Sequence, residues 1–172
     1  KKLDSLIDKI NTYNAEYVFI LGDSKINEKH YYDKFIKKIN SKIYFTPGNH
    51  ELINNRKKDF FSNVGYFYKV IEEKNLKFLL INSSDNKNEI YNFLEKNLSN
   101  EFNGLTILLT HHRIWDDTKL DYGPNKHDKD FYFDEIYQLI KDKVNIIIAG
   151  DSKRPYFRDF TDDKSKYGKQ NV

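Results

Sequence analysis

The sequence predicts an α/β domain with buried strands, and three observations lead to that fold class. Segments with apolar residues at helical spacing alternate along the chain with short β-rich runs. Several of these runs are apolar throughout, which is typical of strands that are covered on both faces. Four of them end in a polar cluster, as strands do where they leave a sheet beside a ligand site.

The elements follow in order from these patterns. Helices are expected around residues 3–10, 35–39, 60–61, 90–98 and 133–140. Strands are expected at residues 17–21, 43–45, 66–71, 76–81, 105–109 and 146–149. The polar stretch 72–75 separates two neighbouring β-rich runs, so we expect residues 66–81 to form a hairpin.

The composition fits one globular domain of 172 residues. Hydrophobic residues make up 38% of the chain, and 13 Tyr and 13 Phe add large apolar surfaces to that low share. The chain opens with Lys1-Lys2 and contains no Met. We therefore expect residues 1–172 to be a single domain that is incomplete at the N-terminus and also at the C-terminus.

Charge and residue usage limit the partners. The net charge is +3, with Lys spread over every expected helix, so no nucleic-acid partner is expected. The absence of Cys excludes disulfides and thiolate metal sites. No apolar run approaches the roughly 20 residues that span a bilayer, so no transmembrane segment is expected. The compartment is left open, with a soluble cytoplasmic protein slightly favoured.

The four polar clusters are the most informative part of the sequence. They are Gly22-Asp23, Gly48-Asn49-His50-Glu51, His111-His112 and Gly150-Asp151. Each alone is typical of a turn or of a structural histidine. Together, Asp, Asn and His at successive strand ends supply the oxygen and imidazole ligands that a hard or borderline metal requires. We expect these strand ends to converge at one site.

The string Phe45-Thr46-Pro47-Gly48-Asn49-His50-Glu51 resembles the Gly-Asn-His-Glu signature of the calcineurin-like metallophosphoesterases. Upstream, Leu21-Gly22-Asp23 resembles the Gly-Asp block of that family, and downstream Leu109-Thr110-His111-His112 resembles its single-His block. The resemblance implies two β-sheets packed as a sandwich with helices on the outer faces, a four-layer αββα fold. It also implies hydrolysis of a phosphomonoester or phosphodiester by attack of a metal-bound hydroxide.

The resemblance assigns roles by position. Asp23 would bridge two metal ions, Asn49 and His111 would bind the second ion, and His50 would be the catalytic histidine near the leaving group. Adjacent residues on an extended segment point opposite ways. One of the two neighbouring histidines is therefore expected to ligate, and His111 is preferred to His112. The cofactors implied are two divalent ions in the intact protein, Mn, Fe or Zn.

Three departures from the family pattern are present. The opening Asp-x-His block is absent, and we expect it on a strand upstream of residue 1. The Gly-Asp block lacks its usual second Asp. The closing Gly-His-x-His block reads Gly150-Asp151-Ser152-Lys153, in which Asp151 could replace a His as a metal ligand, whereas a protonated Lys153 cannot ligate. We therefore predict at most one tightly bound ion and little phosphatase activity for this chain, and more for a longer protein that carries Asp-x-His.

Basic residues beside the expected ligands suggest the substrate. Arg113, Lys153 and Arg154 could hold the oxygens of a small phosphorylated substrate, although solvated loop charges are an equal alternative. Trp115 and the loop 116–129 could wall the pocket, although packing alone also explains such an aromatic. His30 and His127 are interpreted as ordinary surface histidines.

Two further functions are kept beside the phosphoesterase. The first is a metallophosphoesterase-like binding or scaffold module with a degenerate metal site and little turnover, which the altered closing block favours. The second is a binder of phosphosugars or nucleic acid through the basic loops. It ranks low, because the chain has no glycine-rich phosphate loop.

Overall fold

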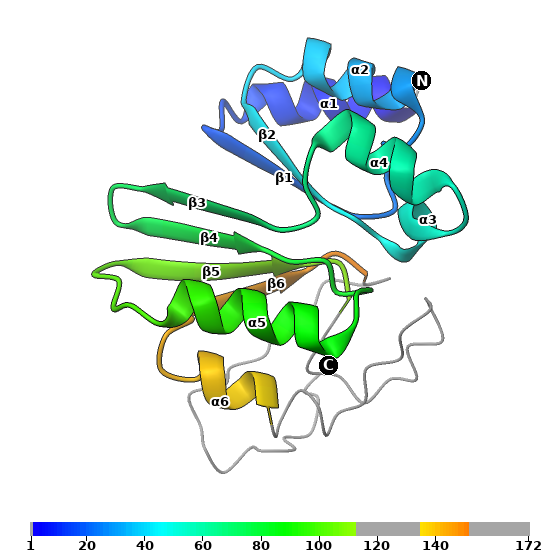
Figure 1. Cartoon of the computed structure of the whole chain (residues 1–172). Coiled ribbons are helices and arrows are strands. Elements are labelled where there is room, and N and C mark those ends of the chain that lie inside the picture. Colours follow the sequence, from blue (N-terminus) through cyan, green and yellow to red (C-terminus); the bar gives the residue numbers. More distant parts are fainter. Residues whose placement is uncertain (1, 113–134, 152–172) are drawn as a thin grey trace, which may run out of the picture.

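The computed structural model describes residues 2–112 and 135–151, and these residues form two sheets (Figure 1). Sheet A consists of two parallel strands, β1 (Tyr17–Leu21) and β2 (Lys42–Thr46). The strands of sheet B, in spatial order, are β3 (Lys69–Glu73), β4 (Leu76–Leu80), β5 (Leu105–Thr110) and β6 (Ile146–Ala149). β3 runs antiparallel to β4, whereas β4, β5 and β6 are parallel.

The helices lie on the outer faces of both sheets (Figure 1). Those beside sheet A are α1 (Lys2–Thr12), α2 (Lys29–Lys38) and α4 (Arg56–Val64), and those beside sheet B are α5 (Lys87–Leu98) and α6 (Tyr137–Ile140). The short helix α3 (Asn49–Leu52) follows the end of β2. None of these helices has both the length and the apolar character needed to cross a bilayer.

Three apolar clusters hold the layers together. Phe35, Phe45 and Phe60 belong to the cluster between sheet A and its helices. Leu94 and Leu108 belong to the cluster between sheet B and α5 and α6. The cluster between the two sheets contains Ile71, Phe78, Leu80 and Leu109, with Phe19, Leu21 and Tyr44 of sheet A packed against them. The layer order is therefore helices, sheet A, sheet B, helices, as the family resemblance implies.

Local sequence explains how α4 and α5 are bounded. The Asn86 side chain caps α5 by accepting a hydrogen bond from the Glu89 amide at 2.9 Å. Ile90, Leu94 and Leu98 then recur every fourth residue and form its buried face. α4 ends at Gly65, which adopts a left-handed conformation with φ of +84° and donates its N–H to Phe61 at 2.8 Å.

The expected hairpin is present with a shorter turn. Glu72 and Glu73, which the sequence placed in the turn, pair with Lys77 and Leu76 in the ladder of β3 and β4. The turn is tight because Lys74 takes a left-handed conformation with φ of +54°. Within the described residues, the carboxyl ends of β1, β2, β5 and β6 carry the four polar clusters, and these ends lie together on one side of the sandwich (Figure 1).

Candidate metal centre

Glu51 joins the two loops of sheet A that carry the candidate ligands. Glu51 is 1% exposed, and its carboxylate accepts three backbone hydrogen bonds. One oxygen accepts from the amides of Asp23 at 2.7 Å and Gly48 at 2.9 Å, and the other accepts from Lys25 at 2.8 Å. Glu51 therefore fixes the loop after β1 against the loop after β2. Sequence reasoning quoted this residue within its motif but gave it no role.

The loop after β1 has an unusual backbone. Gly22, Asp23 and Lys25 all have positive φ, at +84°, +52° and +61°. Left-handed conformations cost a non-glycine residue about 1 kcal/mol or more. The bonds from Glu51 to the amides of Asp23 and Lys25 offset this strain, and the loop thereby holds the Asp23 side chain at the edge of the site.

The Asp23 carboxylate faces both candidate histidines. One oxygen accepts a hydrogen bond from the backbone amide of His50 at 3.2 Å. The other lies 3.6 Å from Nε2 of His111 and 3.9 Å from Nε2 of His50. Asp23, from the end of β1, therefore contacts residues that follow β2 and β5.

His111 is buried and its ring orientation is fixed. Nδ1 lies 2.8 Å from the carbonyl oxygen of Leu21, which can only accept, so Nδ1 carries a hydrogen and donates it. In the neutral ring this leaves Nε2 with a lone pair. Nε2 lies 3.3 Å from Oδ1 of Asn49, so oxygens of both Asn49 and Asp23 lie beside this nitrogen.

The spacing of these three atoms fits a single cation. Two ligand atoms that each lie about 2.1 Å from one ion are about 3.0 Å apart in cis octahedral positions and about 3.4 Å apart in tetrahedral ones. The two distances from Nε2 of His111, 3.3 Å to Asn49 and 3.6 Å to Asp23, are close to these values. Lone pairs at this separation repel one another unless a cation or proton lies between them. The residues present therefore fit a divalent metal.

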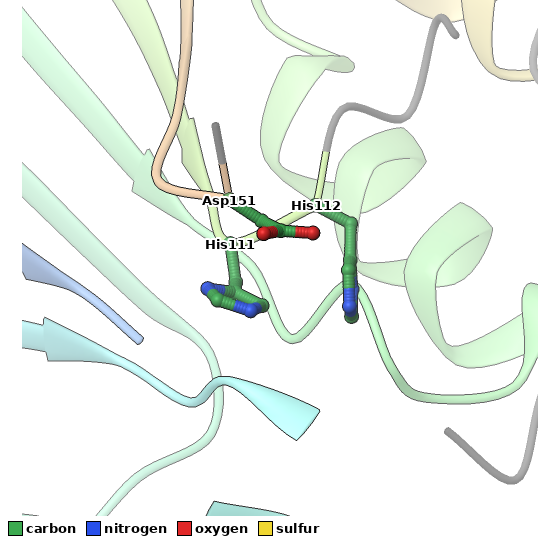
Figure 2. A group of neighbouring side chains, drawn as sticks. All are labelled: His111, His112 and Asp151. Atoms are coloured by element: carbon green, nitrogen blue, oxygen red, sulfur yellow. The ribbon is translucent and has the colours of Figure 1, made fainter. Parts of the chain in front are cut away.

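Asp151 reaches the same site from the end of β6 (Figure 2). Its backbone amide donates to the carbonyl oxygen of His111 at 2.7 Å, and the Gly150 amide donates to the same oxygen at 3.0 Å. Ligand atoms of Asp151, His111 and His112 all lie within 4.8 Å of one another. The loop after β6 is thus tied to the loop after β5, with its carboxylate between the two imidazoles.

His50 lies at the rim of the site. Its side chain is 63% exposed, whereas that of His111 is 3% exposed. His50 is the second residue of α3, directly after Asn49. A histidine that faces both solvent and the Asp23 carboxylate can exchange protons with a bound molecule, whereas the buried His111 cannot do so freely.

Comparison with known proteins identifies the family. The family model of the calcineurin-like phosphoesterases matches residues 1–166. The chain belongs to the calcineurin-like phosphoesterase family. No curated protein sequence matches it.

A solved structure with the same fold is the purple acid phosphatase PPD1 from the seeds of yellow lupin, Lupinus luteus. The TM-score is 0.59 at 17% sequence identity, over 86% of this chain and 32% of the lupin chain. This chain thus spans about a third of the length of the lupin phosphatase. The likeness confirms the layered arrangement of two sheets and helices that the resemblance implied.

Glycines explain how four strand ends of this phosphoesterase domain approach so closely. A Cβ atom on Gly22 would collide with Nδ1 of His111, one on Gly48 with the Asp23 carboxylate, and one on Gly150 with the Leu21 carbonyl. Each of the three glycines therefore leaves room for a ligand residue or for the backbone beside it. The sequence showed these glycines only as turn signals.

The loop after β4 is the second feature that sequence reasoning missed. Ser83 and Ser84 are buried, and both hydroxyls lie near Nδ1 of His112, at 3.0 and 3.4 Å. Asp85 accepts hydrogen bonds from Tyr68 and from the Asn82 side chain, both at 3.3 Å. Burial, together with the Asp85 carboxylate, raises the pKa of the Tyr68 hydroxyl above its usual range, so that it remains a donor. The two serines of this loop therefore border the candidate metal centre.

The structure therefore brings together Asp23, Asn49, His50, His111 and Asp151 from four separate strand ends. The substrate candidates Arg113, Lys153 and Arg154 lie outside the described residues, as do Trp115, the loop 116–129 and His127. His30 lies on α2, where its Nδ1 is 3.9 Å from the Glu28 carboxylate. Its surface assignment agrees with a side chain that is 69% exposed.

Proposed function

We propose that this domain is a metal-dependent phosphoesterase that hydrolyses a phosphomonoester or phosphodiester. Asp23, Asn49, His111 and Asp151 would hold a divalent ion, and His50 would act on the substrate. Membership of the calcineurin-like phosphoesterase family supports the reaction class. The assignment of these residues rests on the arrangement of their side chains.

One observation carries the proposal. Nε2 of His111 lies 3.3 Å from Oδ1 of Asn49 and 3.6 Å from the Asp23 carboxylate, while its Nδ1 donates to Leu21. Metal-binding histidines commonly have their other ring nitrogen fixed by a backbone carbonyl in this way. A structural histidine would instead direct Nε2 at a donor. The arrangement is therefore the one expected of a metal ligand.

Different side chains would bind the ion and transfer a proton. A divalent ion at this site would supply positive charge to a phosphoryl group and lower the pKa of water. Asp23 keeps its two oxygens separately engaged, one by the His50 amide and one toward the imidazoles. His50, exposed at the rim, can donate a proton to the leaving oxygen of the ester.

The substrate would be a small phosphorylated molecule. Arg113, Lys153 and Arg154 would bind its phosphate oxygens through charge-assisted hydrogen bonds. Manganese is the ion we would try first, since carboxylate and amide oxygens with imidazole suit it.

The alternative is a binding module of the same family with little turnover. Within residues 2–112 and 135–151, the ligand atoms that converge suffice for one ion. Asp151 stands where the family has a His, and Lys153 follows where it has another. Two-metal hydrolysis needs both ions, so a one-ion site favours slow turnover.

Metal binding and turnover of three variants separate these functions. Mn²⁺ affinity is measured by calorimetry, and turnover with p-nitrophenyl phosphate and its bis ester. We expect Asp23→Asn to weaken Mn²⁺ binding and abolish turnover, and His50→Gln to lower kcat at least ~100-fold with metal affinity retained. His30→Gln, a surface control, should change neither. Tight Mn²⁺ binding without turnover in the unaltered chain would support the binding module, and no Mn²⁺ binding would refute both.

A further inference from the structure

His112 lies close to two residues already assigned to the candidate metal centre, His111 and Asp151. It is 2% exposed, and its ring centre is 4.6 Å from that of His111, with an angle of 70° between the ring planes. Ligand atoms of His111, His112 and Asp151 all lie within 4.8 Å of one another. Figure 2 shows the Asp151 carboxylate between the two imidazoles.

The path of the backbone explains why two neighbouring histidines face one carboxylate. Strand β5 ends at Thr110, so the strict alternation of an extended strand does not continue through His111 and His112. The segment bends and is held on both sides. Thr110 donates its hydroxyl to the His112 carbonyl at 3.2 Å, while the amides of Gly150 and Asp151 donate to the His111 carbonyl. The expectation that only one of the two histidines can ligate was based on that alternation.

The loop after β4 orients the His112 ring. The Ser83 hydroxyl accepts the His112 backbone amide at 3.0 Å and also lies 3.0 Å from Nδ1 of the ring. A hydroxyl oxygen has two lone pairs and can accept both hydrogens. Nδ1 would then be the donor and Nε2 the atom with the lone pair. A metal-binding histidine commonly has its non-ligating nitrogen held in this manner.

We propose that His112 is a further metal ligand of this domain. A divalent ion would lie among His111, His112 and Asp151 on the side of sheet B, with Asn49 and Asp23 of sheet A facing Nε2 of His111. His112 would supply the imidazole that the closing block lacks, since that block has Asp151 and Lys153 in place of two histidines. The inference rests on the metal site of the proposed function, and it does not depend on turnover.

The ligand set specifies the class of ion. Two imidazoles together with carboxylate and amide oxygens favour a divalent transition metal such as Mn²⁺, Co²⁺ or Zn²⁺ over Mg²⁺, which prefers oxygen ligands and water. The three ligands from sheet B would leave the remaining positions of an octahedral shell to Asn49, Asp23 or water. Such a site would bind one ion tightly, which fits the expectation of a single ion.

Proton NMR of the Co²⁺-loaded 172-residue chain tests the proposal without any substitution. Each imidazole that binds Co²⁺ through Nε2 contributes one strongly shifted exchangeable signal from its Nδ1–H. We expect two such signals in the unaltered protein, from His111 and His112. A single signal would overturn the proposal while the proposed function stands, and an absence of Co²⁺ and Mn²⁺ binding would refute both.

Variants then assign the two signals. His112→Gln should leave one signal and weaken Mn²⁺ binding at least ~10-fold. His50→Gln and His30→Gln should each leave two signals. Thermal unfolding of the metal-free His112→Gln protein checks that it is folded. Two signals and unchanged affinity in folded His112→Gln would exclude His112 as a ligand.

Discussion

The two halves of the candidate metal centre are built in different ways. On the side of sheet A, a buried carboxylate, Glu51, accepts three backbone amides and holds a loop in which Gly22, Asp23 and Lys25 are left-handed. On the side of sheet B, the Leu21 carbonyl oxygen holds the His111 ring, serine hydroxyls hold the His112 ring, and the His111 carbonyl is bonded to the loop after β6.

This difference indicates which half of the candidate site tolerates amino-acid substitution. Charge-assisted hydrogen bonds to a buried carboxylate are about twice as strong as neutral ones, and their loss leaves several amides unpaired at once. The hydrogen bonds on the sheet B side are between neutral groups, and one substitution there removes only one or two of them. We therefore expect a substitution on the sheet A side to abolish metal binding, and a single substitution on the sheet B side only to weaken it.

Substitution of Glu51 should have the largest effect. Glu51→Ala removes the acceptor of three amides, so we expect a loss of about 3–5 kcal/mol in the free energy of unfolding and no measurable metal binding. Urea denaturation of the metal-free protein measures the first, and calorimetry with Mn²⁺ the second. Glu101→Ala, at an exposed position, is the matched control and should change neither. A loss below about 1 kcal/mol would remove the basis for the comparison.

Two glycines with the same φ separate the cost of crowding a neighbouring side chain from the cost of backbone strain. Gly22 and Gly65 both have φ of +84°, but a Cβ on Gly22 would meet His111 whereas one on Gly65 would meet nothing within 4 Å. Gly65→Ala should lower the free energy of unfolding by about 1 kcal/mol. Gly22→Ala should lower it by about 2–3 kcal/mol and should also abolish metal binding. Equal losses in denaturation experiments would show that the contact with His111 is unimportant.

Removal of one hydroxyl probes the sheet B side. Ser83→Ala takes away the acceptor of the His112 amide and the partner of its ring, so we expect a loss of about 1–2 kcal/mol in unfolding free energy. Mn²⁺ affinity should fall several-fold and not vanish. Ser99→Ala serves as the control, since its hydroxyl contacts a helix end far from the site in sequence. Complete loss of metal binding in Ser83→Ala would mean that this half is also all-or-none.

The smallest effect is expected where the sheets are joined. The hydroxyl oxygen of Tyr66 accepts the Phe45 amide at 3.0 Å, and burial raises the pKa of Tyr66 to about 12. A raised pKa favours the protonated hydroxyl in the folded state, so this contribution is complete below pH 10 and is lost as the pH rises toward 12. Tyr66→Phe should lose about 1 kcal/mol at neutral pH and should show a smaller decline in stability between pH 10 and 12. If stability falls equally between pH 10 and 12 in Tyr66→Phe and in the unaltered protein, other titrating groups cause that decline.

Much of the secondary structure could be predicted from the sequence, because apolar residues recur at helical spacing or in short β-rich runs where helices and strands bury them. Residues 17–21 form β1 over the expected range, and the hairpin was also expected from the pattern. The sandwich arrangement was expected from the resemblance to the calcineurin-like family, and the alternation of elements is compatible with it. The turn of the hairpin was placed wrongly because Glu72 and Glu73 are polar, yet both pair with β4. Polarity alone does not separate the end of an exposed strand from a turn.

The candidate site was predictable as a set of residue types but not as a geometry. The motifs indicated Asp23, Asn49, His50 and His111 and, by position, Asp151. The part played by Glu51 depends on amides from two loops. The role proposed for His112 depends on a bend after Thr110 and on Ser83 from another strand end. Such contacts join residues that are far apart in sequence, and no local pattern encodes them.

The origin of the ligands also makes the ion a cross-link. Asp23 and Asn49 follow strands of sheet A, whereas His111 and Asp151 follow strands of sheet B, so one bound cation would connect the two sheets at their carboxyl ends. A ligand that binds only the folded chain raises its stability by about 2.7 kcal/mol when its free concentration is 100 times its Kd. The temperature of unfolding would therefore report how far the site is filled, even for a variant that turns over no substrate.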